Sequence, residues 1–133
     1  MSAVPKSEQA VVLRSDADGV ATLTLNRPKQ YNAINSAILE RLQAELDSIA
    51  ADPAVRVVII AANGPAFSPG HDLKEMMANR NEKFIGDLFD HCSKVMLAMQ
   101  ALPQPVIARV QGVATAAGCQ VVWFPSPVVG GTT

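Results

Sequence analysis

The chain has 133 residues, and its eleven lysine and arginine side chains nearly balance twelve aspartate and glutamate side chains, which gives a formal net charge of -1. This length predicts one domain with a sizeable core, and the mixed charge argues against nucleic acid or an acidic membrane surface as a partner. Apolar residues make up 49% of the chain but aromatic residues only 5%. Val, Ile, Leu, Ala and Met must therefore build the core, which favours an α/β fold.

Cysteine usage and hydropathy exclude several further classes of protein. Cys92 and Cys119 are the only cysteines, and they are too few for a disulfide framework and lack the spacing of zinc ligands. Free thiols in a reducing cytoplasm are therefore expected. No apolar run approaches the length of about 20 residues needed to span a bilayer. The first residues show neither a signal-peptide core nor an arginine-rich transit pattern.

The predicted elements begin with two short strands. Residues 10–14 and 20–25 flank an Asp-Ala-Asp-Gly turn at 16–19 and predict a hairpin, which the following Asn-Arg-Pro ends because proline lacks the donor of a strand ladder. A helix then begins near Asn35 or Ser36, since either side chain can cap the first free amides. The buried face of this helix repeats at helical spacing in Leu39, Leu42, Leu46 and Ile49.

Strands and helices alternate along the rest of the chain. Residues 55–62 are apolar on both faces, which is typical of a parallel strand covered on both sides. Residues 82–101 predict a long helix ended by two prolines, and 106–110 predict another strand. The small residues of 113–120 then allow a helix to begin close to a neighbouring backbone. The apolar face of the long helix is Ile85, Leu88, Cys92, Val95, Met99 and Leu102.

The stretch at 66–74 reads Ala-Phe-Ser-Pro-Gly-His-Asp-Leu-Lys and joins the strand at 55–62 to the helical region. Its Pro-Gly pair breaks the chain, and Asp72 can open a helix. A turn that ends a strand and starts a helix leaves backbone N–H groups without partners, so an anionic oxygen is a natural group to bind there. We therefore expect the functional site at this turn.

Four segments, taken in this order, resemble the crotonase (enoyl-CoA hydratase/isomerase) superfamily. They are residues 25–28 with 32–35, then 57–62, then 66–73, and finally 106–112 continued by Ala-Ala-Gly-Cys-Gln at 116–120. The run at 114–120 further resembles the group of enoyl-CoA hydratase domain-containing protein 3. The resemblance implies an α/β fold, a crotonase-like spiral of strand-strand-helix turns that is incomplete in this chain, assembled into homo-trimers or hexamers. It also implies an acyl-CoA thioester as ligand and no separate cofactor, because coenzyme A is part of the substrate.

The resemblance also implies site residues. Two backbone N–H groups, those of His71 and Ala117, would hold the thioester oxygen and stabilise an enolate. Gln120 takes the position of a catalytic glutamate, and its amide can orient a water but cannot donate or take the proton. A second glutamate would lie beyond residue 122. The residues expected to bind substrate are Lys29, Ala66, Ser68, Gly70, Asp72, Leu73, Lys74 and Gly118.

Two side-chain roles stay open at this point. Lys29 either reaches the nucleotide phosphates of coenzyme A or is simply a solvated lysine. The imidazole of His71 is either an acid or base beside the thioester or a space-filling group that contributes only its backbone amide.

The function implied is that of an enoyl-CoA hydratase-like lyase of fatty-acid metabolism, in the cytoplasm or, for a eukaryotic relative, in the mitochondrial matrix. The alternative is a non-catalytic or truncated acyl-CoA-binding member that lacks the acid/base glutamates. A Ser68–His71 hydrolase is a third reading, although no G-x-S-x-G elbow accompanies the pair. We expect a disordered N-terminus at 1–9, the N-terminal portion of a crotonase-like domain at 10–122 with partly uncovered apolar faces such as 57–60, and an atypical, disordered tail at 123–133.

Overall fold

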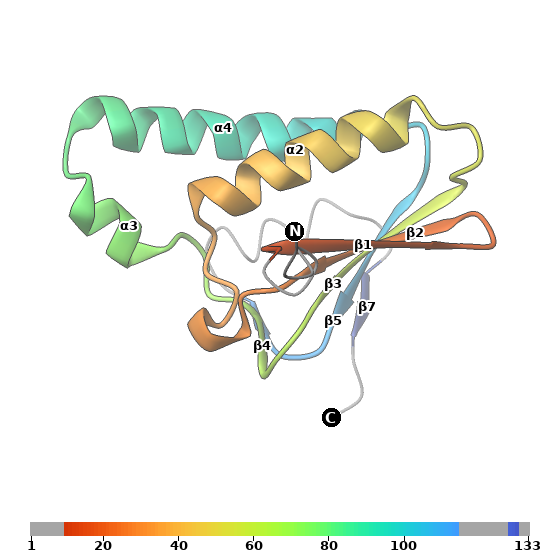
Figure 1. Ribbon diagram of the computed structural model, residues 1–133, viewed down its shortest axis with the longest axis horizontal. Helices are drawn as coiled ribbons and strands as arrows, with labels where there is room; N and C mark the ends of the chain where they lie inside the picture. Colours follow the sequence, from red (N-terminus) through yellow and green to blue (C-terminus); the bar gives the residue numbers. More distant parts are fainter. Residues whose placement is uncertain (1–9, 115–127, 131–133) are drawn as a thin grey trace, which may run out of the picture.

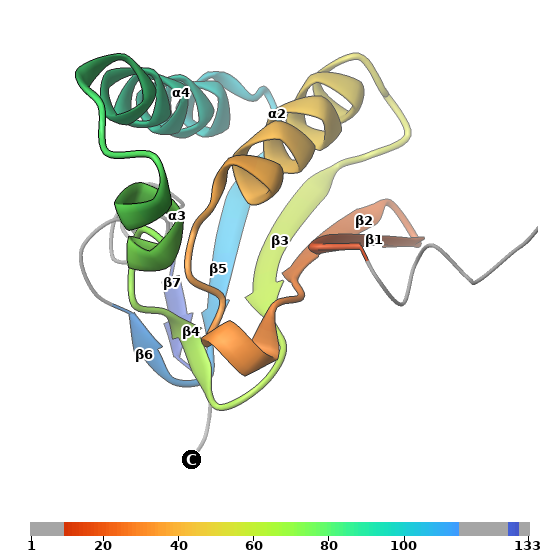
Figure 2. The same cartoon turned by 60° about the vertical axis from the view of Figure 1, so that its left-hand side comes forward.

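Two helices cover one face of a five-stranded sheet in the computed structural model, which describes residues 10–114 and 128–130 (Figures 1 and 2). The strand order is β1-β2-β3-β5-β7. The first two strands are antiparallel and the others continue in parallel. The strands are β1 (Val12–Ala17), β2 (Val20–Leu25), β3 (Val57–Ala62), β5 (Val106–Val110) and β7 (Val128–Gly130).

The predicted hairpin is confirmed, with a tighter turn than expected. β1 continues through Ala17, which pairs with Val20, so only Asp18 and Gly19 form the turn. Both have positive φ, 53° and 81°. Such a two-residue turn matches the twist of its strands, and Asp-Gly is among the pairs that adopt it most readily. The two-residue loop therefore lies at the C-terminal end of the predicted turn at 16–19.

The predicted helices are α2 (Ser36–Ala50) and α4 (Glu82–Ala101), which lie side by side on the sheet (Figure 1). The Asn35 side chain accepts from the Ile38 amide at 2.9 Å, and Asn81 accepts from Phe84 at 2.7 Å, so each helix begins at an asparagine cap. Their buried faces are Ile38, Leu39, Leu42, Leu46 and Ile49 in α2, and Leu88, Cys92, Val95, Met96 and Met99 in α4.

Burial of these helical faces stabilises the fold. Each fully buried Leu or Ile contributes roughly 1.5–3 kcal/mol relative to an exposed one.

Cys92 is a free thiol in this core, and its burial raises the thiol pKa. Cys119 lies outside the described residues. None of the helices described is both long and apolar enough to cross a bilayer.

Three features of the structure go beyond the sequence patterns. β4 (Ala66–Ser68) and β6 (Val113–Ala114) pair in parallel as a second, two-stranded sheet, where 113–114 were expected to enter a helix. β7 lies within the tail expected to lack structure and pairs with β5. Strands as short as these form through backbone hydrogen bonds to a neighbour and need no side-chain period of their own.

β3 is covered less completely than a strand buried on both faces. Val58 and Ile60 are fully buried against the helices, whereas Val57 and Ile59 on the opposite face are only half-buried. The expectation of a partly uncovered strand at 57–60 is therefore met within the described residues.

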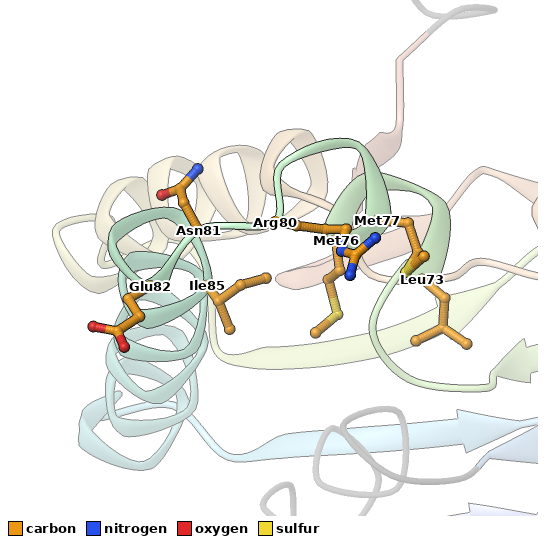
Figure 3. Close-up of a pocket in the computed structure, with 7 residues that line it drawn as sticks. All are labelled: Leu73, Met76, Met77, Arg80, Asn81, Glu82 and Ile85. Carbon is orange, nitrogen blue, oxygen red and sulfur yellow. The ribbon is translucent and has the colours of Figure 1, made fainter.

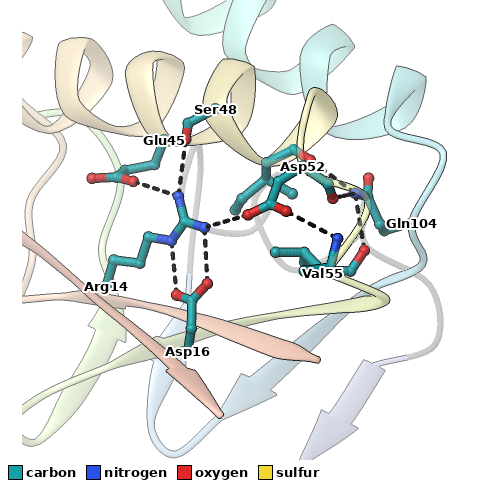
Figure 4. Close-up of polar contacts among 9 residues, drawn as sticks. Arg14, Asp16, Glu45, Ser48, Asp52, Val55 and Gln104 are labelled. Carbon is teal, nitrogen blue, oxygen red and sulfur yellow. Dashed lines mark hydrogen bonds and ion pairs between the residues drawn. The ribbon is translucent and has the colours of Figure 1, made fainter. Parts of the chain in front are cut away.

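Polar side chains tie the hairpin and the sheet to the end of α2 (Figure 4). Arg14 of β1 donates to Asp16 at 2.8 and 2.9 Å and to Glu45 and Ser48 of α2 at 3.2 Å. The Gln104 side chain donates to the carbonyl oxygen of Ile49 at 2.8 Å. These contacts link β1 and the loop before β5 to the C-terminal half of α2.

Gly112 precedes β6 at a point where the chain touches β4. A Cβ atom there would collide with the carbonyl oxygen of Pro65 and lie 3.0 Å from the Ala66 Cα. Because both are backbone atoms, we expect Gly112→Ala to lower the free energy of unfolding by about 1–3 kcal/mol in urea titrations. Gly86→Ala is the matched control, since open space surrounds its Cβ in α4, and it should stabilise by about 1 kcal/mol. Equal effects would contradict the crowding at β4.

Candidate functional site

A parallel bridge joins the loop before α2 to the turn after β4 and sets the direction of the His71 amide. The Ile34 N–H donates to the Gly70 carbonyl at 2.7 Å, and the Asp72 N–H donates to the Ile34 carbonyl at 2.7 Å. The residue between two such partners directs its own N–H to the opposite side. The N–H of His71 therefore points away from Ile34, and no described group accepts it.

An ion pair locks the same turn. Arg27 Nη1 lies 3.1 Å from the Asp72 carboxylate and donates to the Ala33 carbonyl at 2.6 Å. Both charged side chains are largely buried, with 16% and 12% of their surface exposed. Arg27 holds this turn and places its positive charge beside Asp72. The negative charge of the carboxylate next to the His71 amide is therefore compensated.

Asp72 caps α3 (Leu73–Ala78) itself. Its carboxylate accepts from the Lys74 amide at 2.9 Å and from Glu75 at 3.3 Å. The expectation that the first amides of this helix stay free for an anionic oxygen is thus wrong for these two groups, because the capping side chain already occupies them. The His71 amide, one residue before the cap, remains.

Asn32 supports the turn from inside the protein. It is fully buried and has φ of 62°. Its Nδ2 donates to the carbonyls of Asn63 at 2.8 Å and Ala66 at 2.9 Å, while its Oδ1 accepts from the Arg27 amide at 2.8 Å. One side chain therefore fixes the 3₁₀ helix η1 (Pro28–Gln30) against the start of β4.

A pocket of about 650 Å³ opens beside His71, and we call it the lysine pocket. It brings together five of the predicted residues, Lys29 from η1 and His71, Asp72, Leu73 and Lys74 from the turn and α3. The other residues that complete it were not predicted. They are Gln30, Tyr31, Ala33, Pro69 and Met76.

Three predicted substrate-binding residues lie behind this pocket instead of lining it. Ala66 and Ser68 are buried in β4, and Gly70 is a buried turn residue with φ of 110°. The Ser68 hydroxyl accepts from the Gly70 amide at 3.2 Å. These residues shape the turn, and the prediction that they bind substrate stays a prediction.

The same contacts remove the hydrolase reading. Ser68 is fully buried, and the His71 Nδ1 atom has no hydrogen-bond partner among the described residues. A serine nucleophile needs a base within hydrogen-bond reach. Ser68 and His71 do not form that pair.

A second pocket of about 590 Å³ adjoins the first, and we call it the methionine pocket (Figure 3). It shares Leu73 and Met76 with the lysine pocket and extends to Met77 and Ile85 between α3 and the start of α4. Leu73 and Met77 are 71% and 63% exposed, which is high for large apolar side chains. A signal in the sequence could have indicated this pocket, namely the helical spacing of Leu73, Met76 and Met77 after Asp72. Arg80, Asn81 and Glu82 form its polar edge.

Three predicted site residues, Ala117, Gly118 and Gln120, lie outside the described residues. The approach of the Ala117 amide to that of His71 therefore stays a prediction. Within residues 10–114 and 128–130, no cluster of three or more His, Cys, Asp or Glu side chains could hold a metal ion.

The fold and site define a class: a mixed α/β protein in which the turn after a short parallel strand holds a backbone N–H beside a partly apolar pocket. The sequence profile of the family described as enoyl-CoA hydratase/isomerase matches residues 15–129. The chain belongs to this family, the crotonases, as its sequence motifs predicted.

Individual relatives agree with this assignment. The chain is 45% identical over 104 residues to enoyl-CoA hydratase domain-containing protein 3, mitochondrial, of Xenopus laevis, covering 78% of this chain and 35% of the relative. It is 38% identical over 112 residues to 2,3-dehydroadipyl-CoA hydratase of Escherichia coli, covering 84% and 43%. The crystal structure of an enoyl-CoA hydratase from Mycobacterium smegmatis superposes with a TM-score of 0.88 at 50% identity, covering 90% and 47%. The chain therefore spans less than half the length of each of these proteins.

Proposed function

We propose that this chain binds acyl-CoA thioesters and polarises the thioester carbonyl through the backbone amides of His71 and Ala117, as an enoyl-CoA hydratase/isomerase-like protein of fatty-acid metabolism. The observation that carries the proposal is the His71 N–H, which the bridge to Ile34 directs away from its neighbours and which no described group accepts. A rigidly held donor beside a pocket, without an acceptor among the described residues, is what a developing enolate oxygen requires.

The two pockets suit the two ends of such a ligand. Lys29 and Lys74 of the lysine pocket offer positive charge to the phosphates of coenzyme A. The methionine pocket offers an apolar surface to the acyl chain, and its shared wall with the lysine pocket lets one ligand occupy both. Assembly into trimers or hexamers and a cytoplasmic or mitochondrial location belong to the same proposal.

The chemistry of hydration asks for more than polarisation. Water must be activated on one side and a proton delivered to the α-carbon, and a glutamine at position 120 can only orient a water. Glutamine at the position of a family glutamate favours the alternative that the protein binds acyl-CoA without hydrating it. The two candidates agree on the ligand and differ in turnover.

Carbonyl polarisation can be measured directly. Crotonyl-CoA labelled with ¹³C at the thioester carbonyl should show a downfield carbonyl resonance when it binds, because two N–H donors withdraw electrons from the oxygen. Free coenzyme A is the control for binding through the nucleotide alone. Equal affinity for the two ligands, with an unshifted carbonyl resonance, would contradict the proposal. A hydration assay on the same sample then separates catalyst from binder.

A further inference from the structure

The His71 side chain has one buried nitrogen and one accessible nitrogen. Its ring packs edge-to-face on Phe89, with centroids 4.9 Å apart and planes at 67°. Nδ1 is buried without a hydrogen-bond partner. Nε2 has no partner among the described residues either, and unlike Nδ1 it is not one of their buried unpaired atoms. Because His71 is partly exposed, we take Nε2 as its accessible nitrogen. His71 also lines the lysine pocket.

This asymmetry decides where the proton of a neutral imidazole lies. Buried backbone N–H groups without an acceptor are rarer in proteins than under-satisfied acceptors. A buried imidazole N–H without an acceptor would likewise cost the desolvation of the donor. The proton is therefore more stable on Nε2, where solvent or a ligand can accept it. A charged ring would need a buried N–H at Nδ1 as well.

Burial disfavours that charged ring and lowers the pKa of His71. The Glu75 carboxylate acts in the opposite direction, and it is itself held by the Ser36 amide at 3.0 Å. Glu75 is thus occupied by the backbone of the α2 N-terminus and does not hydrogen-bond to the ring.

We propose that His71 is held as the neutral tautomer with its proton on Nε2, and that this N–H donates a hydrogen bond to an oxygen of the ligand in the lysine pocket. The identity of that ligand as an acyl-CoA thioester rests on the proposed function. The side chain then adds a second donor to the backbone amide of the same residue.

The assignment also answers whether this imidazole is a general base. A base needs an accessible nitrogen that carries a lone pair. In His71 the lone pair lies on the buried Nδ1, and the accessible Nε2 already bears its proton. His71 therefore binds the ligand and takes no proton from it.

The tautomer is testable without any ligand. Long-range ¹H–¹⁵N spectra of ¹⁵N-histidine protein distinguish protonated from bare ring nitrogens, and His71→Gln identifies the His71 signals against those of His91. At about pH 8, well above the ordinary histidine pKa of about 6.5, we expect a protonated Nε2 and a bare Nδ1. A protonated Nδ1 with a bare Nε2 would overturn the proposal.

Paired substitutions test the donor role. Gln places an N–H₂ group near the position of Nε2, whereas Asn reaches only as far as Nδ1, and both keep the backbone amide. We expect His71→Gln to hold crotonyl-CoA within about threefold of wild type and His71→Asn to weaken binding about tenfold, the value of one hydrogen bond. Equal losses in the two variants would overturn the donor role. If wild type binds no thioester, the proposed function and the ligand contact both fail, while the ¹⁵N spectrum still decides the tautomer.

Discussion

Asp72→Ala is expected to lower the free energy of unfolding by about 3–5 kcal/mol, because it leaves the largely buried Arg27 guanidinium without its carboxylate. The same change removes the cap of α3, since the amides of Lys74 and Glu75 lose their acceptor. Urea denaturation followed by circular dichroism measures the loss. Binding of crotonyl-CoA should fall with it, because the turn that directs the His71 amide loosens.

Asp87→Ala is the matched control for charge and contact distance. Asp87 pairs with Lys83 at 3.0 Å on the surface of α4, where the two side chains are 66% and 85% exposed. Solvent screens such a pair, so its removal should cost only about 0.3–0.5 kcal/mol. A loss from Asp72→Ala no larger than that from Asp87→Ala would show that the buried ion pair does not hold the turn.

Asn32→Asp is expected to destabilise the protein by a similar amount, about 3–5 kcal/mol at pH 7, although the two side chains have nearly the same shape. The exchanged atom is the Nδ2 group, which donates to the carbonyls of Asn63 and Ala66. A carboxylate there would face two acceptors in a fully buried position. Asp tolerates the left-handed backbone of this residue about as well as Asn, so the backbone contributes little to the difference.

The pH dependence of this variant follows from its burial. A carboxyl group facing two carbonyls has a raised pKa in the folded state, so the folded variant binds a proton that the unfolded chain has already lost. The deficit relative to wild type should therefore be smaller at pH 5 than at pH 8, both measured by urea titration. Asn63→Asp is the control, because Asn63 is exposed and its Nδ2 donates only to the Asn26 Oδ1, at 3.1 Å in an exposed position. A deficit independent of pH would contradict the placement of Nδ2 between the two carbonyls.

Local patterns predicted the longer elements well, and the reason is visible in particular residues. The α4 helix has the predicted bounds because Asn81 caps it and two prolines follow it, and both signals act within a few residues. The β4–β6 sheet was not predicted, because three-residue and two-residue strands have no period and form only when distant segments meet.

The candidate site was predicted in part. Lys29, His71, Asp72, Leu73 and Lys74 do line one pocket. Ala66, Ser68 and Gly70 belong to the same motif, yet they are buried behind it. A motif marks a continuous stretch, whereas a pocket takes only the side of that stretch that faces outward. The methionine pocket could not be predicted from one segment, because α3 and the first turn of α4 form it together.

The amino-acid sequence alone determined the family, the two long helices and the turn that carries His71, since these depend on capping residues, prolines and apolar spacing that act over short distances. The tertiary structure alone decided which way the His71 amide points and which of its ring nitrogens is accessible. Both depend on Ile34 and Phe89, which are far from His71 in the chain and meet it only when the loop before α2 and the face of α4 pack around the same turn.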